Sequence, residues 1–560
     1  MKPRILVVAN HFPPEAVGGA EVVAHRQALA LRRRGFEVTI LASGLPRAGF
    51  ESGALRVDEV DGLTVYRLAV QSHSTEANFH WPAAAARLQA IIAACDIEIV
   101  HFHNVTGLGA NLIPAAKALG CRTIVTLHDH WGFCFKNTRL RNDGAVCMNA
   151  EECGACLPAI AQASVSIPIR LRRDYVAWCL EQADLLVSPS AYLARTYEAS
   201  GVIRRPVSVL SNGINNHAIA VSSPSGGGEV AFVAFAYFGE HKGIPQLIQA
   251  ADRLSTDPEL KGRWSLTFAG HGHLEPEIVK AAGDKRFHGA VRHVGRLRHH
   301  EALALMGRSD VAVLASVWPE NEPVTMLEAI STGTAQLASR LGGVSELVDE
   351  DASGLTFPAG DVEALAAAMR RFIREPGLAA SFGAYNAARR DRFDEQHSID
   401  RLQEMLTVLQ PAPDLEEIVV LCAGRAPAED VLLAVQHLHR VETGDRPIRM
   451  VWHEWAGVEL WGQAQLLWFW GEDGKLDSRL VSRALRYGVP VLAPEGSRNL
   501  AAAGETGAPY RSLLDAMTWI AALPDMPHTD GFRTQTGAAR RLLASGADRS
   551  SFRLSAELPA

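Results

Sequence analysis

The sequence lacks the features that mark membrane-spanning and nucleic-acid-binding proteins. No apolar run in its 560 residues approaches the ~18 residues that a helix needs to cross a bilayer. Its 55 Lys and Arg residues are outnumbered by 62 Asp and Glu residues, and the formal net charge is -7. A general nucleic-acid binder would show a basic excess instead. We therefore expect neither a membrane span nor a nucleic-acid partner.

The first residues also lack the pattern of an export signal. Two basic residues and a short apolar run are followed at once by Asn10, His11 and two prolines. A signal peptide needs a longer apolar stretch and a small-residue cleavage site. The chain has only eight cysteines, and four of them lie between 134 and 156, whereas an exported protein more often spreads cysteines as disulfides. We expect a cytoplasmic protein.

Alternating strand and helix patterns fill the first part of the chain. Short runs rich in Val, Ile and Leu, such as Ile5–Ala9 and Thr123–Leu127, are typical of strands buried on both faces of a parallel sheet. Helical stretches such as Ala20–Arg34 lie between them. The pattern predicts a doubly wound α/β domain over residues 1–218, interrupted by a cysteine-rich insertion at 131–158.

The same alternation restarts after Ser222–Gly228, whose Ser- and Gly-rich composition is that of a linker. It predicts a second α/β domain at residues 229–411, which we expect the helical stretch Ser398–Leu409 to close. A third α/β part, residues 414–560, begins with another apolar strand.

Three loops at predicted strand ends carry groups suited to an anionic sugar compound. Gly18 and Gly19 precede a helix, whose N-terminus favours an anion. Lys242 lies at a strand–helix corner, where a lysine can neutralise a diphosphate. Glu320 and Glu328 can accept hydrogen bonds from sugar and ribose hydroxyls at a carboxyl-end loop. The plain alternatives are a tight connection, a solvated lysine and a solvated acidic loop.

Taken together, the motifs resemble those of the retaining glycosyltransferases of family 4, whose two-domain fold is called GT-B. The resemblance implies an α/β protein with two facing Rossmann-like, doubly wound parallel-sheet domains, here followed by a C-terminal α/β module. The motifs run in the family's order over residues 1–410: Gly18–Glu21, Thr126–Asp129, Ser211–Ile214, Lys242–Gly243, Gly270–Gly272, Glu320 with Glu328, and Gly342–Glu346.

The resemblance also implies an activity. A nucleotide-diphosphate sugar would bind in a cleft, and its sugar would pass with retention to a glycan or lipid-linked acceptor in surface polysaccharide or glycoconjugate synthesis. His128 would face the donor sugar, Glu320 its hydroxyls and Lys242 its diphosphate, with no cofactor and no catalytic metal. The implied donor-binding residues are Gly18, Gly19, Gly270, Gly272, Glu320, Asn321, Pro323, Val324 and Glu328.

The sequence departs from the family at one position. The family usually carries an arginine five or six residues before the lysine, where this chain has Tyr237 and Ala236. The missing phosphate contact would have to come from elsewhere, such as Arg296 or Arg340. Two other interpretations stay open: a noncatalytic glycan-binding scaffold with a decayed donor site, and a nucleotide-sugar epimerase of the same fold.

Four cysteines form a second feature. Cys134, Cys147, Cys153 and Cys156 follow the pattern C-x12-C-x5-C-x2-C, which is compatible with tetrahedral zinc and less suited to an iron–sulfur cluster. We predict a structural zinc that orders a loop on the acceptor side. Free thiols and disulfides are the alternatives.

Two basic stretches, Ser166–Tyr175 and Arg32–Arg34, predict contact with anionic lipid at the inner membrane leaflet, which would bring a lipid-linked acceptor to the cleft. Solvated helix faces are the alternative.

Residues 414–560 resemble a worn repeat of the second domain, because Leu327–Ala338 lines up with Ser482–Ala493. Lys475 and Arg483 then stand where Glu320 and Glu328 do. We therefore expect a noncatalytic, donor-domain-like module. Its tryptophans are either core residues or platforms for stacking on sugars. Chance similarity between two helix–turn–strand units is the alternative.

Overall fold

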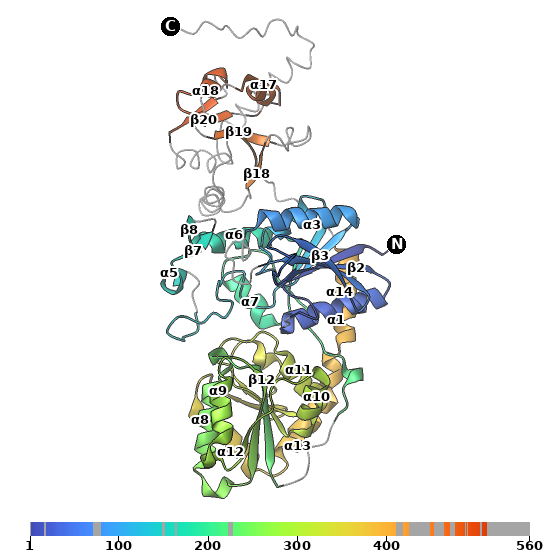
Figure 1. Cartoon of the computed structure of the whole chain (residues 1–560), viewed down its shortest axis with the longest axis vertical. Helices are drawn as coiled ribbons and strands as arrows, with labels where there is room; N and C mark the ends of the chain where they lie inside the picture. The colour runs from blue at the N-terminus through green and yellow to red at the C-terminus, as the bar shows by residue number, and fades with distance from the viewer. Residues whose placement is uncertain are drawn as a thin grey trace. The chain divides into compact units, whose positions relative to one another are not determined.

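A computed structural model of the chain divides into two compact units, Met1–Pro411 and Ala412–Ala560 (Figure 1). In the first unit it describes residues 2–15, 18–70, 80–147, 152–162, 165–221 and 228–409. In the second it describes residues 418–424, 448–452, 464–470, 477–487, 489, 491–503 and 507–511. The predicted linker Ser222–Gly228 lies outside the described residues except for Gly228. Among the described residues, no helix combines the length and the apolarity that crossing a membrane requires.

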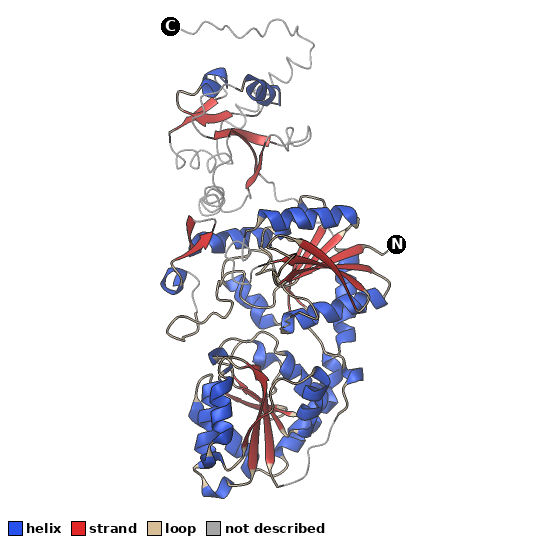
Figure 2. Ribbon diagram, in the orientation of Figure 1, coloured by secondary structure: helices blue, strands red, loops and turns tan. Residues whose placement is uncertain are grey.

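The first unit begins with an eight-stranded sheet in the order β10-β9-β6-β5-β1-β2-β4-β3. Its neighbouring strands pair in parallel except β3 and β4, which form an antiparallel pair. The central strands are buried along almost their whole length, which suits a sheet covered by helices on both faces (Figure 2). They are β1 (Arg4–Ala9), β2 (Glu37–Gly44), β3 (Leu55–Val60), β4 (Leu63–Ala69), β5 (Ile99–Phe102), β6 (Arg122–Thr126), β9 (Leu185–Ser188) and β10 (Ser208–Val209).

Helices connect these strands, and a small antiparallel sheet of β7 (Ala159–Gln162) and β8 (Val165–Pro168) follows the cysteine-rich segment. The helices are α1 (Gly19–Arg33), α3 (Pro82–Ala94), α4 (Leu112–Lys117), α5 (Cys153–Cys156), α6 (Ile169–Glu181) and α7 (Ala191–Ala199).

The second sheet of this unit has the order β13-β12-β11-β14-β15-β16 and is parallel throughout. This is the strand order of a dinucleotide-binding, doubly wound domain. Its strands are β11 (Val230–Tyr237), β12 (Trp264–His271), β13 (Val291–His293), β14 (Val311–Leu314), β15 (Ala335–Ser339) and β16 (Gly354–Phe357). Its helices are α8 (Ile244–Ser255), α9 (Glu275–Gly283), α10 (His299–Arg308), α11 (Val324–Thr332), α12 (Val362–Arg374) and α13 (Leu378–Arg389).

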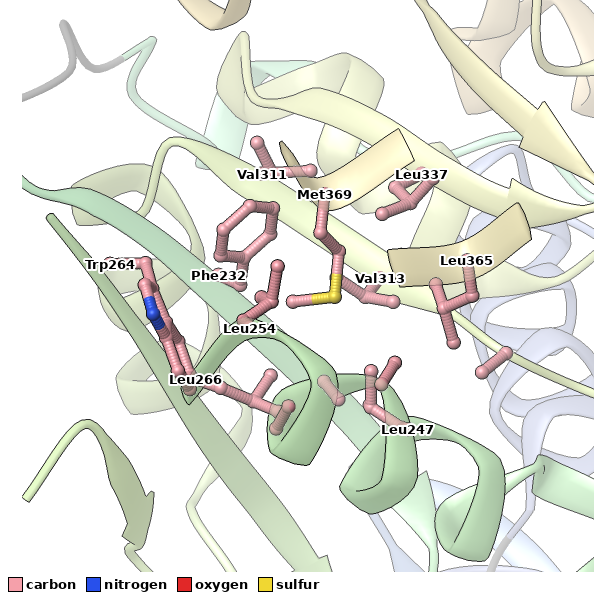
Figure 3. Packing of buried hydrophobic residues seen from close by; sticks show 14 of the residues in the cluster. Phe232, Leu247, Leu254, Trp264, Leu266, Val311, Val313, Leu337, Leu365 and Met369 are labelled. Carbon is pink, nitrogen blue, oxygen red and sulfur yellow. The ribbon is translucent and has the colours of Figure 1, made fainter. Parts of the chain in front are cut away.

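A single apolar core holds one face of this second sheet to its helices (Figure 3). Phe232 and Leu266 of the central strands pack with Leu254 of α8 and Met369 of α12, all of them buried. Burying such side chains contributes about 1.5–3 kcal/mol each. The loops at the strand ends are thereby carried on a rigid frame.

Helix α14 (Glu395–Val408) corrects the predicted organisation. We expected Ser398–Leu409 to close the second domain, but its buried side chains belong to the core of the first. Leu402 and Leu406 pack in one cluster with Ile5 and Leu31. Two ion pairs fix the helix there, Arg26 with Glu395 and Arg34 with Asp400, each at 2.6 Å.

The second unit contains a parallel sheet in the order β18-β17-β19-β20-β21. Its strands are β17 (Ile418–Gly424), β18 (Ile448–Trp452), β19 (Ala464–Trp470), β20 (Val491–Pro494) and β21 (Gly507–Tyr510), with helices α17 (Ser478–Tyr487) and α18 (Arg498–Ala503). Trp468 and Trp470 are buried and stacked with ring centroids 3.9 Å apart. These two tryptophans are therefore core residues and not sugar platforms; Trp455, Trp461 and Lys475 lie outside the described residues.

Candidate functional site

The predicted site residues gather at the carboxyl ends of parallel strands. In the first sheet the strand order reverses between β1 and β5, and in the second between β11 and β14. Doubly wound sheets bind ligands at such switch points. The loops after β1, β6, β11 and β14 carry Gly18 and Gly19, His128, Lys242 and Glu320 in turn.

An ion pair forms the centre of the site in the second domain. Lys242 ends a short 3-10 helix, Glu240–Lys242, and its Nζ lies 2.6 Å from Glu320 Oε1. Ser316 Oγ at 2.6 Å and Trp318 Nε1 at 2.8 Å donate to the same oxygen. Lys242 also stands over the Trp318 ring, 4.9 Å from its centroid. The sequence thus predicted two site residues that the fold pairs directly.

Glu320 is held as a carboxylate although only 6% of it is exposed. Burial by itself would raise its pKa, but the Lys242 ammonium and the hydrogen bonds from Lys242, Ser316 and Trp318 outweigh burial and bring the pKa below its usual value. All three donors reach Oε1. Oε2 is then the oxygen that remains for a ligand hydroxyl.

Two glycines shape this loop. Gly243 starts α8 with φ of 68°, and a Cβ there would lie 1.8 Å from Ala315 O, so only glycine lets the helix begin against the end of β14. Gly342 has φ of 72°, and a Cβ there would lie 2.1 Å from Glu320 O. The next amide, Gly343 N, donates to Glu320 O at 2.7 Å. The Gly342-Gly343 pair therefore fixes the Glu320 backbone by close packing and by this hydrogen bond.

Gly270 and Gly272, predicted to bind the donor, lie at and just after the end of β12. A Cβ at Gly270 would lie 1.9 Å from Ala236 O, and one at Gly272 would lie 2.5 Å from Phe238 backbone atoms. Both glycines therefore pack closely against the end of β11 and the residue that follows it, on the way to Lys242.

Glu328 lies in α11, is 8% exposed and accepts from His299 of α10, with 2.8 Å between Glu328 Oε1 and His299 Nε2. This hydrogen bond raises the pKa of His299 above its usual value. The carboxylate predicted to meet a ribose is thus paired with an imidazole in the structure. His299 was not predicted, because nothing in the sequence shows that the start of α10 faces α11.

The residues between the two glutamates reach the first domain. Asn321 Nδ2 donates to His128 O at 3.1 Å, and its Oδ1 accepts from Ser190 Oγ. Glu322 accepts from Ser211 Oγ and from Asn212 N, both at 2.6 Å, and burial raises its pKa to about 7. The Asn321-Glu322 turn therefore joins the loops of the two domains.

On the first-domain side, a Cβ added to Gly19 would lie 3.7 Å from Val324 Cγ2. The first residue of α1 thus lies against the first turn of α11, whose N-cap is Pro323. Gly18 N donates to Glu21 Oε2 at 2.8 Å. The structure therefore places Gly19 beside Val324; that these residues and Pro323 bind the donor stays a prediction.

His128 is part of a buried histidine cluster. Its Nε2 lies 2.9 Å from His103 Nδ1, and the two rings stack with centroids 5.2 Å apart. His101 stands 4.3 Å beyond His103. Burial lowers the pKa of His128 to about 4 and that of His101 to about 3, so these imidazoles are neutral at pH 7. The sequence did contain a signal for His103, because His101-Phe-His103 lies at the end of the apolar run that begins at Ile97.

Asp129, the next residue, is an unusual carboxyl group. It accepts from Trp131 N at 2.8 Å and Asn104 Nδ2 at 3.2 Å. Burial nevertheless raises its pKa to about 7. The histidines on the first-domain side of the site are therefore neutral and Asp129 is only partly ionised at pH 7, whereas the second-domain side carries the Lys242–Glu320 ion pair.

Neither arginine suggested as a second phosphate contact is held at this centre. Arg340 is exposed and its Nε donates to Thr356 Oγ1 at 3.0 Å, while Arg296 is exposed on the segment after β13. At the position where the arginine was expected, the Tyr237 ring is flanked by His271 and His273, with centroids 5.8 and 6.1 Å away.

The basic stretches predicted to contact lipid are partly used by the fold. Arg172 is fully buried, and its Nη1 donates to Trp131 O at 3.0 Å. Arg32 Nη1 donates to Asp61 O at 2.8 Å, and Arg34 pairs with Asp400. Arg172 is therefore no part of a surface patch.

The four clustered cysteines line one pocket of about 670 Å³ in the first domain, and none of them is in a disulfide. In the described part of the chain, no three His, Cys, Asp or Glu side chains already stand close enough to hold a metal ion. The predicted zinc stays a prediction at this point.

Two family models match consecutive parts of the chain. Residues 17–217 match the model described as Glycosyltransferase Family 4, and residues 218–389 match Glycosyl transferases group 1. A glycogen synthase of Mycobacterium tuberculosis is 28% identical over 383 residues, which are 67% of this chain and 87% of that protein. The amylovoran biosynthesis glycosyltransferase AmsK of Erwinia amylovora is 27% identical over 180 residues, 31% of this chain and 44% of that protein.

Solved structures share the fold of the first unit. Sucrose-phosphate synthase from Thermosynechococcus elongatus has a TM-score of 0.55 at 17% identity, covering 72% of this chain and 98% of that one. Anabaena HepE in complex with UDP-glucose has a TM-score of 0.52 at 15% identity, covering 73% of this chain and all of that one. These likenesses confirm the predicted GT-B fold of parallel α/β sheets.

Proposed function

This chain belongs to the family 4-like glycosyltransferases with the GT-B fold, and from that premise we propose that it transfers a sugar, with retention of configuration, from a nucleotide-diphosphate sugar to a glycan or lipid-linked acceptor. The product would be a surface polysaccharide or glycoconjugate. Relatives named as a glycogen synthase and as an amylovoran biosynthesis glycosyltransferase support a polysaccharide product.

The observation that carries the proposal is the Lys242–Glu320 pair at the strand switch point. A buried carboxylate that three donors fix through Oε1 presents its second oxygen to a sugar hydroxyl in one orientation. The Lys242 ammonium, 2.6 Å away, supplies the positive charge that a diphosphate leaving group needs. Glu328, nearly buried in α11 and hydrogen-bonded to His299, would bind ribose after a nucleotide displaces that histidine.

The same geometry argues against a covalent intermediate on Glu320. A carboxylate that accepts three hydrogen bonds, one of them from the paired Lys242 ammonium, is a weak nucleophile, because its charge is already delocalised onto its donors. We propose instead that the acceptor attacks on the face that the leaving group vacates and that a phosphate oxygen takes the acceptor proton. His128, held neutral by burial, would contribute a hydrogen bond to the donor sugar and no charge. No catalytic metal is required in this scheme.

The test is a transfer assay. The full chain would be incubated with a panel of nucleotide sugars and of glycan or lipid-linked acceptors, with no divalent cation added, and the anomeric configuration of the product read by NMR. We expect transfer with retention from one donor and none from Glu320→Gln. Epimerised donor without acceptor would support the epimerase alternative instead. Donor binding without turnover on any acceptor would support a glycan-binding scaffold.

A further inference from the structure

The cysteine-rich segment of the first domain is built as two arms that face one pocket. In the first arm, Cys147 N donates to Arg139 O at 2.7 Å, and Leu140 pairs antiparallel with Val146, so a hairpin presents Cys147. In the second arm, the single turn of α5 carries Cys153 and Cys156 three residues apart. All three thiols, and that of Cys134, line the same pocket.

Polar contacts tie the arms together. Asn142 Nδ2 in the hairpin donates to Cys156 O at 3.1 Å, and Arg141 Nη1 lies 3.3 Å from Glu152 Oε2. These contacts put the tip of the hairpin beside α5, which brings the C-x2-C pair of α5 to the arm that carries Cys147.

The fourth thiol comes from a turn that precedes the hairpin. Cys134 N donates to His130 O at 2.8 Å, and Asn137 N donates to Cys134 O at 3.0 Å. This turn holds Cys134 in the lining of the same pocket as the other three cysteines.

Positive charge lines the same pocket. Arg139 and Arg173 lie in its lining together with the four cysteines. Buried positive charge is costly unless negative charge lies nearby. Four thiolates around one divalent ion carry a net charge of about -2, which would balance these arginines.

We propose that Cys134, Cys147, Cys153 and Cys156 bind one zinc ion as a structural site. Four cysteines of which two form C-x2-C are the ligand set that zinc takes in tetrahedral structural sites. Binding releases the thiol protons to solvent. In the described segments no three such side chains stand close enough to hold a metal ion, so binding would draw the four sulfur atoms closer together within the two arms.

The site is built on residues far from Lys242 and Glu320 in the sequence, so its test does not depend on the transfer activity. The full chain would be purified without a polyhistidine tag, and its metal content measured by inductively coupled plasma mass spectrometry. We expect about one zinc per chain. A mercurial thiol reagent should release that zinc, as seen with a colorimetric chelator.

Two variants sharpen the test. Cys147→Ser and Cys156→Ser should each lower zinc content at least fivefold. Cys95→Ser is the matched control, because Cys95 is half-buried, lies outside the cluster and contacts Tyr66 OH at 3.7 Å; it should keep the zinc. Should the cluster variants fail to fold, removal of zinc from the wild type by a chelator still decides: the melting temperature should fall and recover on adding zinc back.

Three results would overturn the proposal. One is metal-free chain in which all four thiols react with a thiol reagent. Another is metal-free chain whose mass is lowered by the hydrogens lost to disulfides. The third is iron in place of zinc, with the visible absorption of an iron–sulfur cluster.

Discussion

The second domain and the C-terminal module are built on the same strand order, but they differ in what that order carries. The neighbours β12-β11-β14-β15-β16 of the second domain correspond to β18-β17-β19-β20-β21 of the module. In both, one helix precedes the next-to-last strand: α11 before β15 and α17 before β20. The proposed repeat aligns these same elements, and β21 takes the place of β16.

The second domain and the C-terminal module differ in the charge at an aligned position. α11 carries Glu328, nearly buried and paired with His299, whereas the aligned position of α17 is the half-buried Arg483. The sheet is fixed by apolar side chains inside it, such as Leu337 in β15 and Leu492 in β20. The sheet can therefore persist while the loops and helix ends that hold a ligand change, because apolar core residues maintain the sheet and other residues bind the ligand.

The largest effect should come from the centre of the second domain. Lys242→Met should lower kcat/KM by about 10²–10³ because the diphosphate loses its cation. It should also cost about 3–5 kcal/mol of stability, since it leaves the buried Glu320 charge unpaired. Steady-state kinetics and urea unfolding measure the two effects.

The double variant Lys242→Met/Glu320→Gln separates these losses. It should recover much of the stability, because no unpaired charge remains, and none of the activity. Lys285→Met, at an exposed lysine of the same domain, is the control and should change neither. Full activity in Lys242→Met would refute the role of the pair.

The next effect should fall on the module alone. Trp468→Ala removes a fully buried ring that stacks on Trp470, and large-to-small changes of this kind cost about 3–5 kcal/mol. Hydrogen exchange should show faster exchange in β17, β19 and β20 and no change in the second domain. Arg498→Ala, on the exposed surface of α18, should leave exchange unaltered. Glycan binding lost with no change in exchange would instead make Trp468 a sugar platform.

A paired substitution tests the charge difference itself. Glu328→Gln should weaken nucleotide-sugar binding about tenfold, because a hydrogen bond to a charged acceptor contributes roughly 1.5–3 kcal/mol. Arg483→Gln, at the aligned position of α17, should leave the dissociation constant unchanged. Isothermal titration of both variants measures this. Equal weakening in the two would show that the module also binds the donor.

The smallest effect is a pH dependence of stability. The pKa of His299 is raised by its hydrogen bond to Glu328, so the pair stabilises the fold fully below the ordinary histidine pKa of about 6.5. That stabilisation is lost as pH rises through the raised value. Because the His299 side chain is 67% exposed, we expect only a few tenths of a kcal/mol. Urea unfolding from pH 6 to 9 should show the difference between wild type and His299→Gln shrinking with pH; a constant difference would contradict the pairing.

The sequence predicts the sheets well where a strand carries an uninterrupted apolar run, as in β1 from Ile5 onward and in β11, because residues on both faces of such a strand are apolar. It misses β3, an antiparallel strand at the sheet edge, because Arg56, Asp58 and Glu59 break its apolar pattern. The apolar stripe of α14 was recognised, but a stripe does not tell which of two cores it will cover.

The candidate site divides in the same way. Lys242, Glu320 and Glu328 were predicted because each sits at a recognisable strand end or helix start. The contacts of His103, His299 and Glu322 arise between segments distant in sequence, and no local pattern encodes such pairings. Arg172 was misplaced because a charged residue in a basic run gives no sign that its neighbours will bury it.

The return of α14 to the first domain means that the chain crosses between the two domains twice. The crossings are bonded to each other: Ile214 N donates to Phe393 O and Glu395 N to Ile214 O, each at 2.9 Å. Two connecting segments that are hydrogen-bonded to each other at one place act as a single hinge. We therefore expect the two domains to move by a hinge rotation about Ile214 and Asp394, and not by sliding of one domain over the other.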